Sequence, residues 1–250
     1  MRRIATLRTL VASIVAAVVL SATACGGDDD GQVDGAASAD GPVGLDGRGG
    51  LDTEGCRRQW TVSVAGGASA AGAAVAGGAL VLRNATTALG DQLDVMHLTT
   101  LTGDFDASFA YEMFVAGGAG AFAQAVLIHA PSAPGDPLVT AGIGNSPQPA
   151  VSATFQPGPV DVQVTAAVAG TFRLRRSGDQ VTTTTTPTGG DPPATVTSTL
   201  ATYPLGIGLQ LGTNTNALVG ETSIRINDFT VTGDGSVSPD DFSCDSVSLQ

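Results

Sequence analysis

Apolar and polar residues alternate in short runs along most of the chain after residue 60. The longest run covers residues 104–115, and its apolar parity ends with Met113 and Val115. Because alternate side chains of a strand point to opposite faces, this run predicts a strand with one face on a core. Phe114 breaks the polar parity, and we expect a loop to cover its side chain.

The same alternation recurs in shorter runs that are separated by Gly, Pro, Asn and Asp. The residues at 177–179 are typical of a tight turn and predict a hairpin between two of the runs. About ten strands, without a convincing amphipathic helix, predict one all-β antiparallel sandwich of two sheets. The further runs are residues 60–64, 80–83, 151–155, 160–164, 172–175, 181–186, 205–211 and 224–231.

The last of these runs changes parity partway along its length. Ile224 and Ile226 lie on one parity. Phe229 and Val231 lie on the other. One extra residue at 227–228 would return both pairs to the same face, so the sequence predicts a β-bulge there.

Two segments are predicted to lack strands. Residues 68–79 are rich in alanine but also in glycine, which disfavours a helix, so we expect a loop or a weak turn. Residues 187–199 are rich in Thr and Pro and are predicted as a long surface loop.

The first 24 residues have the three regions of a secretory signal. Arginines precede an apolar run at residues 9–20, and small residues follow up to Cys25. The apolar run is shorter than the roughly 20 residues that a membrane-spanning helix needs. The Leu-Ser-Ala-Thr-Ala-Cys stretch resembles a bacterial lipoprotein signal, in which the cysteine is lipidated and becomes the mature N-terminus. The resemblance implies an exported chain that is anchored in the cell envelope, in the outer membrane, through acyl chains on Cys25.

Residues 25–55 are mainly Gly, Asp and Ala and show no apolar period. Such a composition buries too little apolar surface to offset the entropy of ordering, so it predicts a flexible acidic linker. We therefore expect a signal at residues 1–24, the folded sandwich at residues 56–246, and a short tail at residues 247–250.

The charge of the chain excludes one class of partner. The formal net charge is −12, and lysine is absent. An acidic surface repels nucleic acid and anionic headgroups, so we expect no nucleic-acid partner. His97 and His129 are isolated, and no motif for a metal ion or another cofactor is present.

The cysteines support an exported chain. With Cys25 assigned to the lipid, Cys56 and Cys244 flank the predicted sandwich. In an oxidising compartment two such residues usually pair, so we expect a disulfide that joins the first and last strands.

Four pieces of sequence follow one another along the predicted sandwich, at residues 101–106, 172–179, 204–211 and 224–231. As an ordered set they resemble the concanavalin A-like lectin and glucanase superfamily. The resemblance implies a jelly-roll sandwich with a concave sheet face, which binds saccharides in many members. Fold does not decide function, so glycan binding is an expectation by analogy.

Glucanases of this superfamily place paired carboxylates on one strand, because glycoside hydrolysis needs two carboxylates about 5 to 10 Å apart. The few glutamates of this chain do not form such a cluster. Asp104 and Asp106 share one face of a predicted strand about 7 Å apart, and Glu112 lies further along it. These three are the weak candidates for catalysis, against the alternative of an outward polar strand face.

Saccharide sites often stack sugar rings on exposed Trp or Tyr. Trp60 and Tyr111 lie on apolar parity and are expected in the core instead. The remaining ligand candidates are polar residues, which we expect on one sheet face beside a shallow trough at Gly206 and Gly208. They are Asp106, Glu112, Gln124, Arg173, Arg175 and Gln210, with Asn214 and Asn216 in the following loop.

The sequence therefore favours a lipid-anchored, extracytoplasmic module that binds glycans or another component of the envelope. Two alternatives stay open at this point. One is a carbohydrate-active enzyme of the same fold, and the other is a purely structural lipoprotein of the envelope.

Overall fold

A computed structural model gives the structure of the chain in seven stretches. Within them the chain forms strands and one short 3-10 turn, η2 (Ala70–Gly72). Nothing in this part forms a helix that could cross a membrane. The predicted signal, the linker and the three cysteines lie outside the described residues. The described residues are 60–85, 90–129, 135–145, 148–201, 204–214, 220–233 and 247–249.

The described strands form two sheets. The eight-stranded sheet contains β1 (Trp60–Ala65), β4 (Gln92–His97), β6 (Ala121–His129), β7 (Leu138–Asn145), β8 (Pro149–Gln156), β9 (Val160–Val164), β13 (Leu205–Thr213) and β15 (Val247–Leu249). The seven-stranded sheet contains β2 (Ala73–Ala76), β3 (Ala79–Asn84), β5 (Phe105–Val115), β10 (Gly170–Ser177), β11 (Gln180–Pro187), β12 (Ala194–Thr199) and β14 (Thr222–Thr232).

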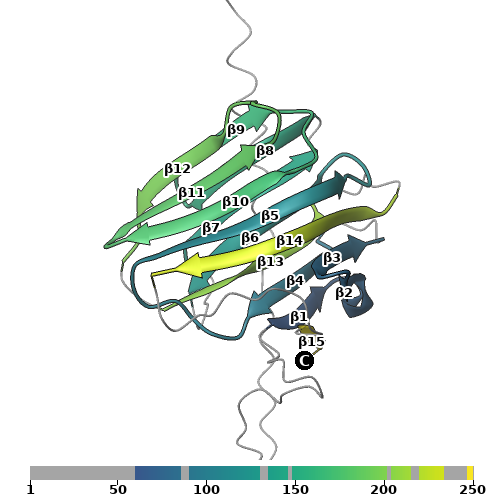
Figure 1. Cartoon of the computed structure of the whole chain (residues 1–250), viewed down its shortest axis with the longest axis horizontal. Coiled ribbons are helices and arrows are strands. Elements are labelled where there is room, and N and C mark those ends of the chain that lie inside the picture. The colour runs from purple at the N-terminus through teal and green to yellow at the C-terminus, as the bar shows by residue number, and fades with distance from the viewer. Residues whose placement is uncertain are drawn as a thin grey trace, which may run out of the picture.

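The two sheets pack face to face, with the seven-stranded sheet in front in Figure 1. The strand order is β15-β1-β4-β13-β6-β7-β8-β9 in one sheet and β12-β11-β10-β5-β14-β3-β2 in the other. Neighbouring strands are antiparallel, except that β15 runs parallel to β1. The predicted antiparallel two-sheet sandwich is therefore confirmed.

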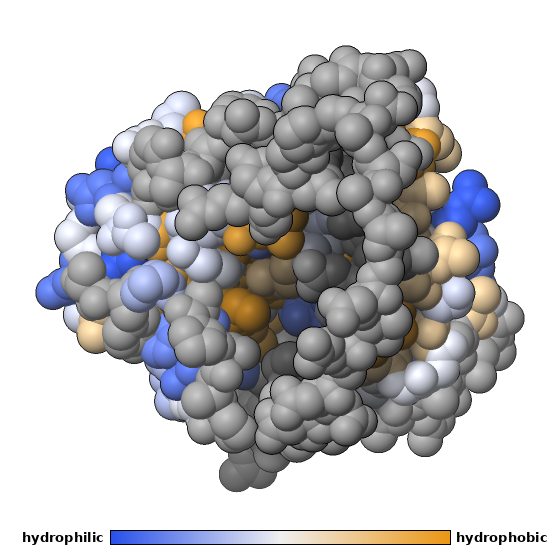
Figure 2. All heavy atoms as spheres, turned by 90° about the horizontal axis from the view of Figure 1, so that it is seen from below, coloured by the Kyte–Doolittle hydropathy of each residue, from blue (hydrophilic) through white to orange (hydrophobic). Residues whose placement is uncertain are grey.

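Aromatic rings join the two layers in the core. Trp60 of β1 packs edge-on against Phe229 of β14, with ring centroids 5.1 Å apart. Phe109 of β5 stacks on Phe229 at 4.6 Å. Trp60 and Tyr111 are buried, as predicted. Seen from below, hydrophobic side chains gather in the middle of the molecule, and most hydrophilic ones lie toward its sides (Figure 2).

Two buried threonines add polar links between the sheets. Thr183 and Thr185 point inward from β11. Their hydroxyls donate to the carbonyl oxygens of Thr140 and Ser152 in the other sheet, at 2.8 and 2.7 Å. The threonine run of β11 therefore supplies hydrogen bonds to the core as well as an outward polar face.

The hairpin and the bulge predicted from the sequence are both present. Ser177 pairs with Gln180, so β10 and β11 form a hairpin around Gly178, whose φ is +58°. The register of β14 against β5 shifts between Ile226 and Asp228, at the predicted bulge. The bulge keeps both halves of β14 directed at the core.

A second bulge, in β5, corrects one expectation. The register also shifts where Met113 of β5 is inserted, and the φ of Met113 is +55°. Beyond this point the parity of β5 reverses, so Phe114 turns inward and is only 6% exposed. Met113 and Val115 are 63% and 53% exposed. The prediction that these two residues face the core and that a loop covers Phe114 is wrong.

Three strands lie in segments that were expected to have none. β2 pairs with β3 within the alanine-rich segment, and β12 pairs with β11 within the predicted surface loop. β15 lies in the predicted tail and pairs with β1. Each of these strands lies at the edge of a sheet, where pairing with a neighbouring strand overrides a weak local preference.

The parallel pairing of β1 with β15 bears on the predicted disulfide. Trp60 lies opposite Val247 in the two strands. In the sequence, Cys56 precedes Trp60 by four residues and Cys244 precedes Val247 by three. The parallel register places the described starts of β1 and β15 side by side, but both cysteines lie outside the described residues, so their pairing stays a prediction.

We expect Cys56→Ser and Cys244→Ser each to lower the free energy of unfolding by roughly 4 to 5 kcal/mol, the chain-entropy value for so long a loop. The double variant should lose no more than either single variant, because all three lack the same bond. Denaturant unfolding of the oxidised full-length chain measures both values. Cys25→Ser is the control, and additive losses or an equal loss in this control would contradict the pairing.

Candidate functional site

β13 lies in the middle of the eight-stranded sheet and is buried along its whole length. Its inward side chains, such as Leu209 and Leu211, fill the core. Its outward positions are Gly206, Gly208, Gln210 and Gly212. Three glycines on one face of a strand leave that face without side chains, so neighbouring strands must cover it.

Two side chains from neighbouring strands cover the glycines. A Cβ on Gly208 would collide with the sulfur of Met96 in β4. A Cβ on Gly212 would lie 3.1 Å from the ring of Phe122 in β6. The trough expected at these glycines is therefore wrong, because Met96 and Phe122 lie across β13 and occupy the space.

A row of polar residues crosses the outer face of this sheet. Gln210 lies opposite Asp94 of β4 on one side and Gln124 of β6 on the other. The row continues through Gly142 of β7 to Ser152 of β8. We call these five residues the polar row. At the usual strand spacing they span about 19 Å across the sheet.

The amide groups of the polar row donate in one direction, toward Asp94. Nε2 of Gln124 donates to Oε1 of Gln210 at 2.8 Å. Gln210 in turn hydrogen-bonds the carboxyl of Asp94. Nε2 of Gln92, two residues before Asp94 on the same strand, donates to its Oδ1 at 2.7 Å. The carboxyl is the end point of a chain of amide hydrogen bonds.

This environment changes the acidity of Asp94. Burial raises the pKa of its carboxyl from 3.8 to about 6, and the hydrogen bonds from Gln92 and Gln210 limit the rise. The carboxyl is therefore about half protonated near pH 6. Below that pH its O–H can donate a hydrogen bond, and above it the carboxylate only accepts.

Apolar side chains flank the polar row. Met96 and Val126 lie on one side, and Phe122 lies on the other. At the end of the row, β9 presents exposed valines at positions 160, 162 and 164, and Val162 lies opposite Ser152. The face thus offers a half-buried polar strip with apolar side chains on both flanks, and Thr140 and Thr154 add hydroxyls beside it.

The face holds a single acid at its outward strand positions. Among the described strands of this sheet, Asp94 is the only Asp or Glu that points outward. No three His, Cys, Asp or Glu side chains of the described part are placed to hold a metal ion. The chemistry that the polar row offers is therefore hydrogen bonding by amides, one carboxyl and one hydroxyl.

The predicted ligand residues do not share one face. Gln124 and Gln210 belong to the polar row, whereas the four charged candidates lie on the outer face of the seven-stranded sheet. The expectation of a common face is wrong, because strand pairing places β5 and β10 in the opposite layer. The charged candidates are Asp106, Glu112, Arg173 and Arg175.

The structure describes only one of the two ligand candidates in the loop after β13. The backbone N–H of Asn214 donates to the carbonyl oxygen of Gly120 at 2.9 Å, which ties the end of β13 to the start of β6. Asn216 lies outside the described residues. The structure therefore does not bring Asn214 into the polar row, and the expectation for Asn216 stays a prediction.

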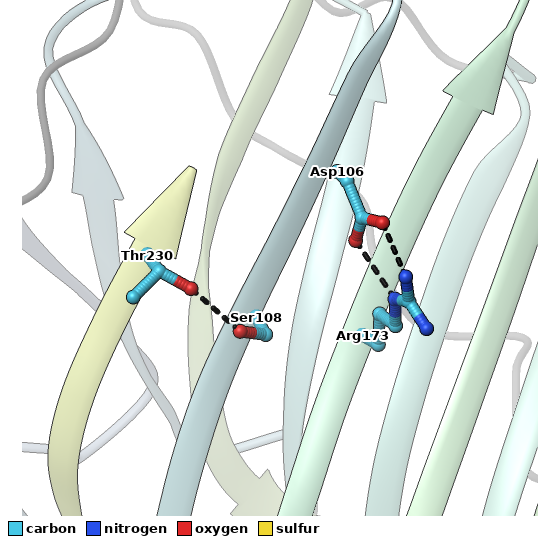
Figure 3. A network of polar contacts seen from close by, with 4 residues as sticks. All are labelled: Asp106, Ser108, Arg173 and Thr230. Atoms are coloured by element: carbon cyan, nitrogen blue, oxygen red, sulfur yellow. Dashed lines mark hydrogen bonds and ion pairs between the residues drawn. The ribbon is translucent and has the colours of Figure 1, made fainter. Parts of the chain in front are cut away.

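The three carboxylates considered for catalysis have structural partners. Figure 3 shows Asp106 held by two hydrogen bonds from Arg173, which keep the pKa of Asp106 below its usual range. Oε1 of Glu112 lies 3.1 Å from Nε of Arg225. Oδ1 of Asp104 accepts from the backbone N–H of the Gly178 turn at 2.7 Å. A carboxylate with a lowered pKa is a poor general acid at neutral pH.

No family model matches the chain, and no curated protein matches it in sequence. Solved structures match its fold. A structure from work on endo-acting O-glycanases of the human gut microbiota is 13% identical, with a TM-score of 0.53 over 72% of this chain and 92% of that one. The LamAcat structure from Zobellia galactanivorans is 9% identical, with a TM-score of 0.50 over 70% and 90%.

A third match is a functionally unknown protein from Saccharomyces cerevisiae, 12% identical, with a TM-score of 0.53 over 70% of this chain and 96% of that one. The fold is that of the concanavalin A-like jelly rolls. Identities this low show the fold of a jelly roll and leave its function to the site.

The acidic residue at the end of the polar row was not identified from the sequence. Asp94 lies in β4, where the polar residues Gln92 and Asp94 alternate with Leu93 and Val95. That alternation was the available signal, and it is too short to stand out from the loops around it. Ser152 was recognised on a strand but not as part of a site.

We expect Asp94→Asn to stabilise the fold at pH 7 and to flatten the dependence of stability on pH. A folded-state pKa of about 6, above the usual 3.8, means that the folded state binds the proton more tightly. Stability from Asp94 is therefore fully present below pH 3.8 and is lost as pH rises through 6. The loss is at most about 3 kcal/mol, and Asn keeps the acceptor for Gln92.

Denaturant unfolding between pH 4 and 7.5 measures this effect. Asp106→Asn is the matched control, because a carboxylate with a lowered pKa contributes stability above its unfolded pKa and loses it as pH falls. That loss falls below pH 4, so Asp106→Asn should keep the wild-type slope between pH 4 and 7.5, whereas Asp94→Asn should flatten it. A wild-type slope in Asp94→Asn would show that Asp94 is not the titrating group.

Proposed function

We propose that the chain is a lipid-anchored, extracytoplasmic carbohydrate-binding module whose ligand lies along the polar row. The observation that carries the proposal is the chain of hydrogen bonds from Gln124 through Gln210 to Asp94, at the centre of an outer sheet face. Each amide offers donors and an acceptor at a fixed position. Neighbouring hydroxyl groups of a sugar need this combination.

The apolar flanks support the same class of ligand. Sugar rings have an apolar face as well as hydroxyl edges, and aromatic and aliphatic side chains can cover that face. Phe122 and the valines of β9 supply such surface beside the polar row. Because the row spans about 19 Å, it suits an extended oligosaccharide that crosses the strands.

The count of acids favours binding over hydrolysis. Glycoside hydrolysis by the usual route needs two carboxyl groups about 5 to 10 Å apart. The outer face of the described eight-stranded sheet has only Asp94 at its strand positions. One of the matched structures comes from work on O-glycanases, which act on carbohydrate chains. By analogy of fold, this match supports a carbohydrate ligand for the present chain.

We expect the purified full-length chain to bind oligosaccharides on a glycan array. Titration calorimetry with the strongest glycan should show that Gln124→Ala and Gln210→Ala each weaken binding about 10-fold or more, because each removes a sugar contact and breaks the amide chain. Chromatography of the recovered glycan should show no new reducing ends.

The matched control for these variants is Gln180→Ala. Gln180 is also an outward amide, but it lies on the other sheet, where it donates to the hydroxyl of Thr199 at 2.9 Å. Its replacement should leave glycan binding unchanged. If no glycan binds, or if Gln180→Ala loses as much affinity as Gln210→Ala, the polar row is not a carbohydrate site and the structural alternative is favoured.

The anchor is the second part of the proposal, and its support is the sequence alone. The positive, apolar and small-residue regions before Cys25 are those of a lipoprotein signal. Several acyl chains together exceed the two membrane signals that stable anchoring needs. The linker of residues 25–55 would then separate the sandwich from the membrane.

Metabolic acyl labelling tests the anchor. We expect mass spectrometry of the membrane-bound protein to find a mature N-terminus at Cys25 that carries acyl chains. Cys25→Ala should lose the label and leave the membrane fraction. A wild-type protein that is unlabelled, or one that begins at another residue, would contradict the anchor and would leave the glycan site to be judged on its own test.

A further inference from the structure

We infer that the outer face of the seven-stranded sheet carries a second binding site, which takes the acidic groups of a polysaccharide. The site consists of Arg173, Arg175, Thr182 and Thr184. It lies on the opposite side of the sandwich from the polar row. It therefore does not depend on the function proposed for that row.

Strand register brings the four side chains together. Arg175 of β10 lies opposite Thr182 of β11, and Arg173 lies opposite Thr184. Residues two apart on a strand share a face at about 7 Å, and residues on neighbouring strands lie about 5 Å apart. Two guanidinium groups and two hydroxyls thus lie at the corners of a rectangle on the sheet face. This area is large enough for one oxyanion and an adjoining sugar ring.

Asp106 of β5 holds Arg173 in place. It accepts two hydrogen bonds from Arg173, as Figure 3 shows, and it lies directly opposite Arg175. A guanidinium has five N–H groups, so the pair with Asp106 leaves Arg173 with others for a ligand. One carboxylate between two guanidinium groups leaves a local charge of about +1.

Arg175 differs from the other outward arginines of the described part. Arg83 lies 3.9 Å from Glu221, and Arg225 lies 3.1 Å from Glu112. The guanidinium of Arg175 is exposed and, in the described part of the chain, has no hydrogen bond or salt bridge, although its charge acts on Asp106. Its guanidinium is therefore available to an external anion without first breaking a contact.

Ordered hydroxyl groups extend the site away from the arginines. Thr182 shares a hydrogen bond of 2.9 Å with Thr197 of β12. Thr195 donates to Thr184 at 3.2 Å. Within each pair one hydroxyl donates to the other, so one O–H and several lone pairs remain for an external partner. The edge of the sheet thus presents hydroxyls at a regular spacing beside the cation.

The lack of stacking side chains on this face favours a polysaccharide over nucleic acid. The net charge of −12 opposes every polyanion at long range, acidic polysaccharides included. At physiological salt, screening beyond about 8 Å leaves the local cations to act on a ligand in contact. The outward positions of the described seven-stranded sheet also lack the aromatic side chains on which nucleic-acid bases stack.

Polygalacturonate and its fully methyl-esterified form are the probes that test the site, because they differ in the carboxylate alone. We expect the full-length chain to bind polygalacturonate, and to bind the ester at least 10-fold more weakly. Arg175→Gln should weaken binding of polygalacturonate at least 5-fold. Arg83→Gln, which removes an outward arginine of the same sheet, should leave it unchanged. Added salt should weaken wild-type binding more than binding by Arg175→Gln.

Two further variants keep the test decisive. If Arg175→Gln does not fold, Arg175→Lys keeps the charge without the fork of N–H donors and should give an intermediate loss. Gln210→Ala should not change the affinity for polygalacturonate. A loss in Gln210→Ala with none in Arg175→Gln would place the acidic ligand on the polar row and overturn this site. Equal binding of acid and ester, equal losses in Arg83→Gln and Arg175→Gln, or no binding of polygalacturonate would also overturn it.

Discussion

The burial of β13 on both faces is the constraint on which the site depends. Its leucines and isoleucine belong to the core between the sheets, and within the described part of the chain side chains from β4 and β6 cover its other face. Glycine at three of the four outward positions makes room for Met96 and Phe122. Gln210 is the one outward side chain of this strand, and it is 7% exposed.

A buried amide must find partners, because an unpaired one loses its hydrogen bonds with water. The partners of Gln210 come from the strands on either side, Gln124 and Asp94. The same burial that closes β13 therefore organises the polar row and raises the pKa of Asp94. The site is a consequence of how the middle of the sheet is packed, and a change to one member should be felt by the others.

The alternation of apolar and polar residues allowed much of this fold to be predicted, because it shows which side of each strand is buried. It placed Trp60 and Tyr111 in the core and located the bulge near Asp228. It could not report which sheet a strand belongs to. Gln124 and Gln210 are 86 residues apart, and only long-range pairing shows that they touch.

The same limit explains the errors in the predicted site. Asp106 and Gln124 were placed together because both are polar residues that were expected on one outward sheet face. Strands of both sheets show the same alternation, with apolar residues inward and polar residues outward. The alternation therefore cannot show which sheet a strand belongs to. Met113 shows a different limit, since its left-handed φ creates a bulge that no neighbouring Gly or Asn announces.

The position of β1 relates the site to the proposed anchor. The described chain begins at Trp60 in β1, which lies beside β4 and, with β15, at one end of the eight-stranded sheet (Figure 1). The polar row begins at Asp94 in β4 and runs from there to β8 and the valines of β9 at the opposite edge. The described chain therefore begins on the β1 side of the sheet, beside the strand that carries Asp94 and away from the valines of β9.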